Sequence, residues 1–189
     1  CGVCNLSCAS VFGPGLHGVG VCGTASGQAE CELDCDPGYF NVDESSANGC
    51  ECLYLSPSDV PDPSGQDANC DGIDGELIRG VFVSVAGDDA NPGTLALPVR
   101  TIARGLSIAG ASSSDLLDHV FVANGIYEES ITLIAGVQLY GGYSSNFRRR
   151  SPVGNETAIF GVAPTPAQRG AINADGITVA TVVDGFTVV

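Results

Sequence analysis

All nine cysteines of this 189-residue chain lie within its first 70 residues. Residues 1–78 also contain thirteen acidic residues and no Lys or Arg, whereas residues 79–189 contain all seven Arg, nine acidic residues and no Cys. Parts with such different compositions are typical of separate structural units. So high a cysteine density is typical of a small oxidised module that lacks a sufficient hydrophobic core. We therefore predict a disulfide-rich module over 1–55, a Pro-rich linker with an acidic loop over 56–78, and a second domain over 79–189.

The spacing of the cysteines leaves zinc as an alternative to disulfides. The pairs Cys1–Cys4 and Cys31–Cys35 have the spacing of zinc ligands. The chain has only two His residues, and its other cysteines form no second ligand pair, so disulfides are favoured. Disulfides predict an extracellular, periplasmic or cell-surface location. Among the many ways to pair the cysteines we predict a Cys52–Cys70 bond, because it closes the acidic loop between them.

The odd number of cysteines leaves one without a partner, and Cys1 is the candidate. A Cys at the first position of a mature chain is what signal-peptide removal leaves in a bacterial lipoprotein. The alternative is a fragment whose missing upstream residues hold the partner of Cys1. The expected location is therefore extracellular or at the cell surface, with a lipid anchor on Cys1 as one alternative.

The formal charge of −15 excludes two classes of partner. Nucleic-acid sites need clustered Lys and Arg to contact phosphate, and anionic membrane surfaces repel a chain this acidic. The longest apolar run is too short to cross a bilayer, so we expect no transmembrane segment.

The acidic loop has the pattern of a calcium site. Oxygen-bearing side chains recur at nearly alternate positions and are interrupted by Gly72, which permits a sharp turn around an ion. A helical calcium loop would end in Glu at its twelfth position, where this chain has Ile78. The alternative is a solvated acidic turn closed by a disulfide. The predicted Ca²⁺ ligands are Asp67, Asn69, Asp71, Asp74 and Glu76.

Residues 79–189 are predicted to be all-β, with one short helix. Brief β-branched and aromatic runs end at Gly or Asn, and several start about twenty residues apart, near the repeat of a parallel β-solenoid. An antiparallel β-sandwich is the alternative, but it would need longer strands and more two-residue turns. Helical spacing predicts a helix over 101–109, with Thr101 as its N-cap. The expected strands are 81–85, 120–122, 137–139, 158–160, 177–179 and 186–188.

Three motifs follow one another along this part of the chain: Gly87-Asp-Asp-Ala-Asn-Pro-Gly-Thr94, Val120-Phe-Val-Ala-Asn-Gly-Ile-Tyr127 and Gly136-Val-Gln-Leu-Tyr-Gly-Gly-Tyr143. They resemble the N-terminal coils of a bacterial family of secreted right-handed parallel β-helices of unknown function, related in fold to pectate lyases. The N-terminal cysteine pattern is similar to the Cys-rich, acidic metal-binding-type repeats that precede such helices in bacterial surface proteins. The resemblance implies that Cys1 lies inside a repeat and that the helix over 101–109 covers the N-terminal end of a right-handed parallel β-helix.

Residues that would support catalysis on a polysaccharide are few. Paired carboxylates cleave glycosides, and the candidates are Asp175 with Asp184 and Glu128 with Glu129. The run 148–150, three Arg beside Tyr140, Tyr143 and Phe147, would either grip an acidic glycan or form a solvated loop. His119 is expected to face solvent, and neither His17 nor His119 lies in a nucleophile motif.

We therefore expect a secreted or cell-surface structural or adhesive protein, a rigid β-helical stalk or assembly subunit without catalysis. Residues 184–189 are expected to form an uncovered strand at the open end of the helix, where further coils or a second subunit would dock. The alternative is a protein that binds or cleaves an extracellular polysaccharide, in the manner of a lyase.

Overall fold

The computed structural model describes residues 7–8, 15–24, 27–112, 116–162 and 170–189. Contacts between residues group the chain into two compact units. Unit 1 comprises Cys1–Asp59 and Asp67–Gly72, and unit 2 comprises Val60–Gln66 and Ile73–Val189. The Pro-rich segment 56–66 contains no helix or strand.

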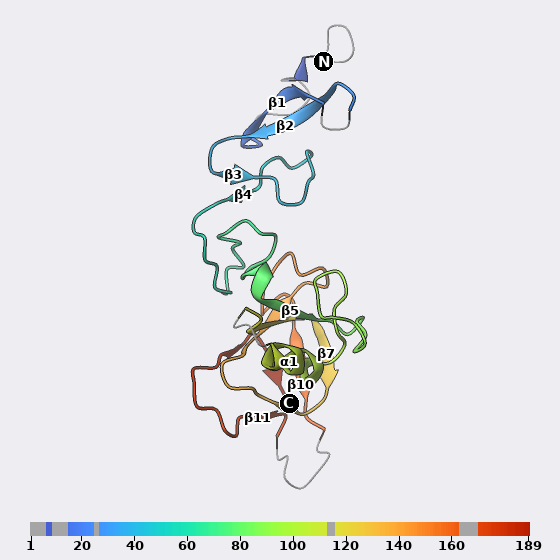
Figure 1. Ribbon diagram of the computed structural model, residues 1–189, viewed down its shortest axis with the longest axis vertical. Coiled ribbons are helices and arrows are strands. Elements are labelled where there is room, and N and C mark those ends of the chain that lie inside the picture. The colour runs from blue at the N-terminus through green and yellow to red at the C-terminus, as the bar shows by residue number, and fades with distance from the viewer. Residues whose placement is uncertain (1–6, 9–14, 25–26, 113–115, 163–169) are drawn as a thin grey trace. The chain divides into compact units, whose positions relative to one another are not determined.

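Unit 1 consists of short antiparallel hairpins with little core. Strand β1 (Gly18–Gly23) pairs with β2 (Glu30–Cys35), and β3 (Tyr39–Phe40) pairs with β4 (Cys52–Leu53), as Figure 1 shows. Among the described residues of this unit, the buried apolar side chains are those of Cys8 and Cys50. Hydrophobic burial alone therefore contributes little to the stability of unit 1.

Disulfides connect the hairpins of unit 1. The described bonds are Cys8–Cys31, Cys35–Cys50 and Cys52–Cys70. The Cys52–Cys70 bond confirms the predicted pairing. Zinc binding by Cys31 and Cys35 is excluded, since each is bonded to another cysteine; Cys1 and Cys4, and with them the question of lipidation, lie outside the described residues. Cys22 is also disulfide-bonded. These bonds indicate that the protein folds in an oxidising environment.

In the described part of unit 2 the strands form three sheets, and the pairings between these strands are parallel. The first sheet has the order β12–β9–β6–β5, the second β13–β10–β7 and the third β11–β8. The chain visits the sheets in turn, as a β-helix-like region does, so the antiparallel sandwich is wrong. The strands are β5 (Gly80–Val83), β6 (His119–Ala123), β7 (Gly125–Glu128), β8 (Ile131–Thr132), β9 (Gln138–Tyr143), β10 (Thr157–Phe160), β11 (Ile172–Asn173), β12 (Val183–Asp184) and β13 (Thr187–Val188).

The predicted twenty-residue repeat holds for one coil only. Val120 of β6 pairs with Leu139 of β9, close to the expected spacing, but Leu139 then pairs with Val183 of β12. The extra residues lie in loops such as 144–156, between β9 and β10. The expected strand over 177–179 is wrong, since Ile172 of β11 is the residue in register with Ile131. Position in the coil outweighs the local β-propensity of Ile177-Thr-Val179.

Alternation along the strands of the first sheet separates two apolar clusters. Val81, Val83, Val120 and Leu139 point into the core between the sheets, where they pack with Ile131 and Ile159. On the opposite face Phe82, Phe121 and Tyr140 lie in register from β5 to β9. This outer cluster also contains Ile73, Ala123, Tyr143 and Phe147. Successive residues of a strand point to opposite faces, so this sheet is covered on both sides.

The helix α1 (Ile102–Ala111) confirms the predicted helix and its N-cap. The hydroxyl of Thr101 accepts a hydrogen bond from the N–H of Arg104 at 3.2 Å. Ile102, Leu106 and Ala109 are buried in the core between the sheets. Gly105 allows the close approach, because a Cβ there would lie 2.6 Å from a methyl carbon of Val83.

Besides α1, the described residues of unit 2 contain the short 3-10 helix η2 (Leu77–Arg79), directly before β5. No helix in the described part of the chain has the length and apolar character needed to cross a membrane.

Candidate functional site

Three of the predicted calcium ligands lie in one loop of unit 1 and bond mainly to one another and to the loop backbone. The carboxylate of Asp67 accepts the N–H groups of Asp71 (3.1 Å) and Gly72 (2.8 Å). Asn69 donates its side-chain amide to the Asp71 carboxylate at 2.9 Å and accepts the Asp71 N–H at 3.1 Å. Burial raises the pKa of Asp67, an effect that these backbone donors only partly offset. The loop is thus folded by its own Asx interactions.

The other two predicted ligands belong to unit 2. Asp74 is 1% exposed, and its carboxylate accepts the N–H of Asp62 at 3.2 Å. Glu76 lies 3.7 Å from the guanidinium of Arg79. Among the residues that the structure describes, no group of three or more His, Cys, Asp or Glu side chains is placed to hold a metal ion. Calcium binding by the five residues stays a prediction.

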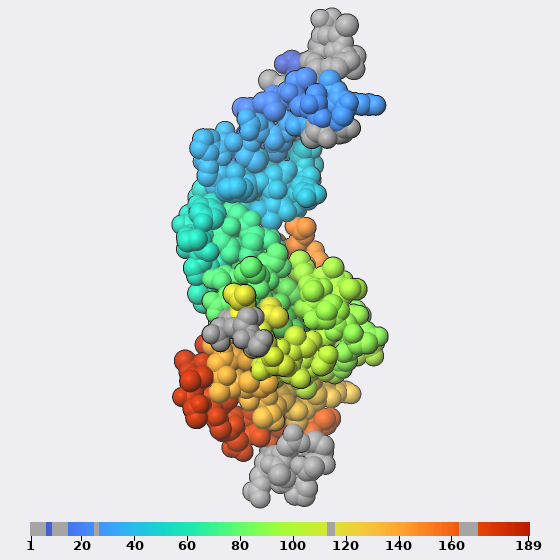
Figure 2. Space-filling model, in the orientation of Figure 1, coloured from blue at the N-terminus to red at the C-terminus, as the bar shows by residue number. Residues whose placement is uncertain are grey.

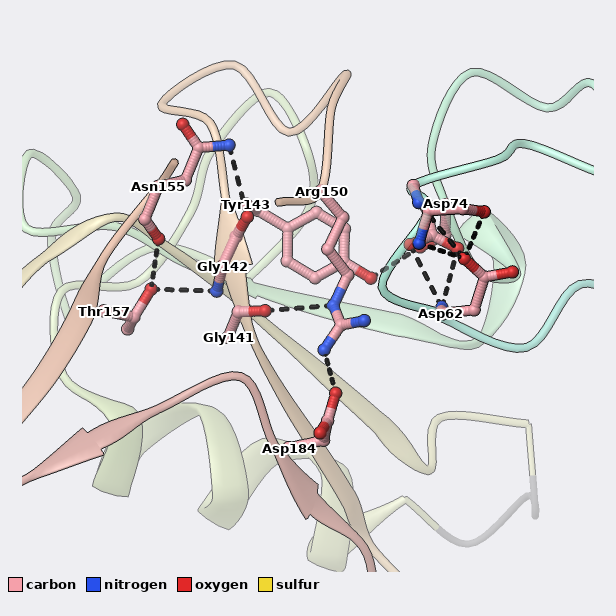
Figure 3. A network of polar contacts seen from close by, with 11 residues as sticks. Asp62, Asp74, Gly141, Gly142, Tyr143, Arg150, Asn155, Thr157 and Asp184 are labelled. Atoms are coloured by element: carbon pink, nitrogen blue, oxygen red, sulfur yellow. Dashed lines mark hydrogen bonds and ion pairs between the residues drawn. The ribbon is translucent and has the colours of Figure 1, made fainter. Parts of the chain in front are cut away.

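A buried arginine organises the outer face of the first sheet (Figure 3). The side chain of Arg150 is 0% exposed, its Nε donates to the carbonyl of Gly141 at 3.0 Å, and one Nη forms an ion pair with Asp184 of β12. The guanidinium carbon lies 5.6 Å from the ring centroid of Tyr140 and 5.9 Å from that of Tyr143. Arg150 therefore links the 144–150 loop to both β9 and β12.

Position 185, next to the Arg150 guanidinium, has room for no residue larger than glycine. A Cβ on Gly185 would lie 2.9 Å from the Arg150 Nη and 2.5 Å from the Gly141 carbonyl oxygen. The other Nη of Arg150 is buried and has no hydrogen-bond partner among the described residues. The run 148–150 is thus divided: Arg148 and Arg149 are exposed, as a solvated loop predicts, but Arg150 is a buried structural cation.

The same network fixes the segment Val60–Gln66 within unit 2. The hydroxyl of Tyr143 donates to the carbonyl of Asp74 at 2.5 Å, and the Asp74 carboxylate accepts the Asp62 N–H (Figure 3). A hydrogen bond from the Ser64 side chain lowers the pKa of Asp62, and the charge of Arg150 contributes in the same direction. Tyr143 and Phe147 are at most 2% exposed, so both are core residues rather than surface residues.

The carboxylates that were candidates for glycoside cleavage have separate surroundings. Asp184 is the ion-pair partner of Arg150, whereas Asp175 is exposed in a turn where its N–H bonds the side chain of Asn173. The structure gives no contact between these two residues. The interpretation of Asp175 and Asp184 as a catalytic pair therefore has no geometric support.

Glu128 and Glu129, in contrast, line a common hollow of about 250 Å³ on unit 2. The Glu129 carboxylate accepts the first two N–H groups of α1, from Ile102 (2.8 Å) and Ala103 (3.0 Å). Burial raises the pKa of Glu129 although these donors oppose the shift. Glu128 is exposed at the end of β7. The remaining lining residues are Val85, Arg100, Thr101, Ile126 and Tyr127.

His119 is 8% exposed, so the expectation that it faces solvent is wrong. Its Nδ1 lies 2.6 Å from the Asp118 carboxylate, and its ring stacks on Tyr140 with centroids 5.7 Å apart. The Asp118 carboxylate also accepts the Nε–H of Arg79 at 2.8 Å. Burial lowers the pKa of His119, and the hydrogen bond to Asp118 offsets this only in part. Burial would raise the pKa of Asp118, but its bonds to Arg79 and His119 lower it.

Burial of His119 predicts a loss of stability in mild acid. Its pKa is lower in the folded protein than the ordinary 6.5, so the unfolded chain takes up the proton first and the free energy of unfolding falls as pH decreases below about 6.5. One proton limits the slope to about 1.4 kcal/mol per pH unit. Urea unfolding of the wild type and of His119→Phe at pH 7.5 and pH 5 measures the free energy of unfolding of each protein. The difference in this free energy between the two proteins is expected to change with pH. A constant difference would contradict it.

Several polar residues that hold segments of unit 2 together were not predicted from the sequence. Asp89, for example, accepts the N–H groups of Arg100 and Thr101 at 2.9 Å and so fixes the entry to α1. The available signal was the acidic turn Gly87-Asp-Asp-Ala-Asn-Pro-Gly-Thr94, because Asp in turns commonly accepts backbone N–H groups. The partners of Asp118 and Glu129, which lie 39 and 27 residues away, had no such local signal.

Comparison with known proteins gives one partial relative and one family. The subtilisin-like protease SBT1.5 of Arabidopsis thaliana is 34% identical over 100 residues, which are 53% of this chain but 12% of that protein. The chain thus spans about an eighth of the length of this curated relative. No solved structure gives a significant match. The model of a family described as a protein of unknown function, DUF1565, matches residues 85–185, more than half of the chain. This chain belongs to the DUF1565 family.

Proposed function

We propose that this protein is a non-catalytic structural or adhesive protein of the extracellular space or cell surface. In this proposal the three parallel sheets of unit 2 form a right-handed parallel β-helix that acts as a rigid stalk or assembly subunit. The disulfides support an oxidising location, and the stacked parallel pairings support a β-helix.

The observation that carries the proposal is a set of charged side chains that connect different layers of unit 2. Arg150 and Asp184 join the loop after β9 to β12, Arg79 and Asp118 join η2 to the residue before β6, and Glu129 binds the start of α1. Each contact connects successive layers of the coil. Ion pairs and hydrogen bonds that connect different layers rigidify a fold, which suits a load-bearing or spacer role.

The edge formed by β11, β12 and β13 supports the assembly part of the proposal. Each of these strands pairs with a described strand on one side only, and Val183, Val188 and Val189 are at least 36% exposed there. The last strands are the red surface of unit 2 in Figure 2. Open backbone groups beside exposed valines are a site for strand addition, and we propose a second copy as the occupant.

Self-association through this edge predicts a specific effect of charge. Val188 lies in register with the buried Ile159, so a Lys at position 188 places a charge over the open core. Val188→Lys is expected to weaken self-association at least tenfold in sedimentation velocity of the oxidised protein. Val153→Lys is the matched control, because Val153 is 98% exposed in a loop, and it should associate as the wild type does. Regular end-to-end particles in negative-stain electron microscopy would support the proposal; dispersed wild-type monomers would overturn it.

The hollow beside Glu129 favours polysaccharide binding as the second candidate function. Arg100 donates its Nε to the carbonyl of Gly87 at 3.0 Å, which holds its guanidinium beside the exposed apolar side chains of Val85 and Ile126. A fixed guanidinium and the Glu128 carboxylate next to an apolar surface suit the hydroxyl groups and apolar ring face of a sugar. A polysaccharide should bind the wild type at least tenfold more tightly than Arg100→Gln, with Arg148→Gln as the exposed control. Equal binding by all three proteins would reject this candidate, and release of shorter chains would indicate cleavage.

A further inference from the structure

The two ends of unit 2 differ in whether their strand edges are covered. At the end formed by β11, β12 and β13, each strand pairs with a described strand on one side only. In β11 the carbonyl of Ala171 accepts the N–H of Ile131, and the carbonyl of Asn173 accepts the N–H of Leu133. Alternate residues of a strand direct their backbone groups to opposite sides. The N–H and C=O of Ile172 therefore point to the open edge of β11.

Strands β12 and β13 present their backbone groups in the same way. The carbonyl of Val182 accepts the N–H of Leu139, so Val183, the next residue, directs its own groups to the open edge of β12. Val188 has the equivalent position in β13, because its neighbour Val189 bonds to β10. The side chains of Val183 and Val188 are 36% and 51% exposed. This end of unit 2 thus presents three short open edges with exposed valines beside them.

The opposite end of unit 2 is covered. The outer edge of β5 is bonded to the segment 93–99: Phe82 donates its N–H to the carbonyl of Gly93 at 2.8 Å, and Val99 donates to the carbonyl of Phe82 at 3.0 Å. The helix α1 contacts β5, β6 and β8 and buries Leu106 in the core between the sheets. The edge of β5 is therefore already paired, and α1 covers the core beside it.

We propose that two copies of the protein associate through the same β11–β12–β13 edge and form a closed two-fold dimer. The dimer rests on the self-association through this edge that is part of the proposed function. A head-to-tail chain needs a second, complementary surface on each copy, and the end that carries β5 and α1 offers no open strand edge to serve as one. The open edge of one copy is matched by the open edge of the other. An edge that meets its own counterpart pairs antiparallel, and the valines of both copies then cover the two cores.

Charge determines the conditions under which this dimer forms. Each copy has a formal charge of −15, so two copies repel one another. Asp184 in β12 has a side chain that is 49% exposed, and Glu156 accepts the hydroxyl of Thr187 in β13 at 3.1 Å. A two-fold contact brings these carboxylates toward those of the other copy. Salt screens this repulsion, so we expect the dimer to become tighter as salt is added, the opposite of a contact between unlike charges.

Sedimentation velocity of the full-length oxidised protein over a range of concentrations tests the proposal. The expected species are monomer and dimer, with a Kd at least threefold lower in 500 mM than in 50 mM NaCl. The double variant Ser107→Lys, Ala111→Lys changes the exposed surface of α1 and is the matched control for the covered end. It should dimerise as the wild type does.

Mixing fluorescently labelled wild type with unlabelled Val188→Lys distinguishes a closed dimer from an open chain. Both copies of the two-fold dimer use this edge, so the wild type should bind the variant at least threefold more weakly than it binds itself. In a head-to-tail chain the variant would keep an unaltered α1 end, and the wild type would bind it with full affinity. Circular dichroism shows that the variant is folded.

Several results would overturn the two-fold dimer and leave self-association in place. These are species that grow beyond the dimer with concentration, full affinity of the wild type for Val188→Lys, and weaker association of the α1 variant. Association that weakens as salt is added would overturn it as well, because it would show unlike charges at the contact. Wild-type monomers at every concentration and salt would overturn both the dimer and the proposed self-association.

Discussion

Replacing Arg150 with Ala is expected to lower the free energy of unfolding of unit 2 by about 3 kcal/mol. The substitution leaves the carbonyl of Gly141 without its donor, removes the partner of Asp184, and opens a cavity beside the rings of Tyr140 and Tyr143. The estimate is at the low end for a broken buried ion pair, because the side chain of Asp184 is 49% exposed and regains water. Urea unfolding followed by circular dichroism measures the effect.

Two further variants separate the contributions to this loss. Arg149→Ala removes the same side chain from the exposed neighbouring position and should change stability by less than about 0.5 kcal/mol. Arg150→Met fills most of the volume without the charge, so its remaining loss measures the polar contacts. An Arg150→Ala protein as stable as Arg149→Ala would contradict the role of Arg150 as the link between β9 and β12.

Reduction of the disulfides is expected to unfold unit 1 and leave unit 2 folded. The loop closed by Cys35 and Cys50 spans 15 residues, and a cross-link of that length contributes about 3 kcal/mol. The described part of unit 1 has no apolar core to replace this contribution. Unit 2 contains no cysteine, so reduction does not act on it directly.

Hydrogen exchange with mass spectrometry of the full chain, with and without reductant, tests this expectation. Amides of β1 and β2 should lose their protection after reduction, whereas amides of β6 and β9 should keep it. The double variant Cys35→Ala, Cys50→Ala should reproduce part of the effect without reductant. Loss of protection in both units would show that unit 2 depends on unit 1, and no loss in either would show that the disulfides contribute little.

Local patterns in the sequence were sufficient to predict those elements of unit 2 that have regular hydrophobic alternation or a clear helical spacing. The run Val81-Phe-Val83 predicted β5, the helical spacing after Thr101 predicted α1, and both elements are present. The pairing of Cys52 with Cys70 was also predictable, because the two residues close one short loop. Ile177-Thr-Val179 had equal β-propensity but forms no strand, since a strand in a stacked coil needs a partner in register.

The surroundings of the polar residues were less predictable than the strands. His119 was expected to face solvent, and Arg150 was placed in a run that would either grip an acidic glycan or form a solvated loop. Both are buried against the ring of Tyr140. Glu129 was a candidate for glycoside cleavage with Glu128, but its carboxylate binds the start of α1. In each case the partner is supplied by a segment that only the fold brings near, so no local pattern marks it.

The sequence by itself determined the oxidised N-terminal module, the alternation of the strands and the position of the helix, because cysteine density, period-two hydrophobicity and capping residues act within a few residues of each other. Only the tertiary structure decided which charged groups are buried and what they bind. Arg150 meets Asp184, and Arg79 meets Asp118, across 34 and 39 residues of chain. The free energy of such a pair depends on burial and distance, and both are set by the stacking of coils rather than by neighbours in the sequence.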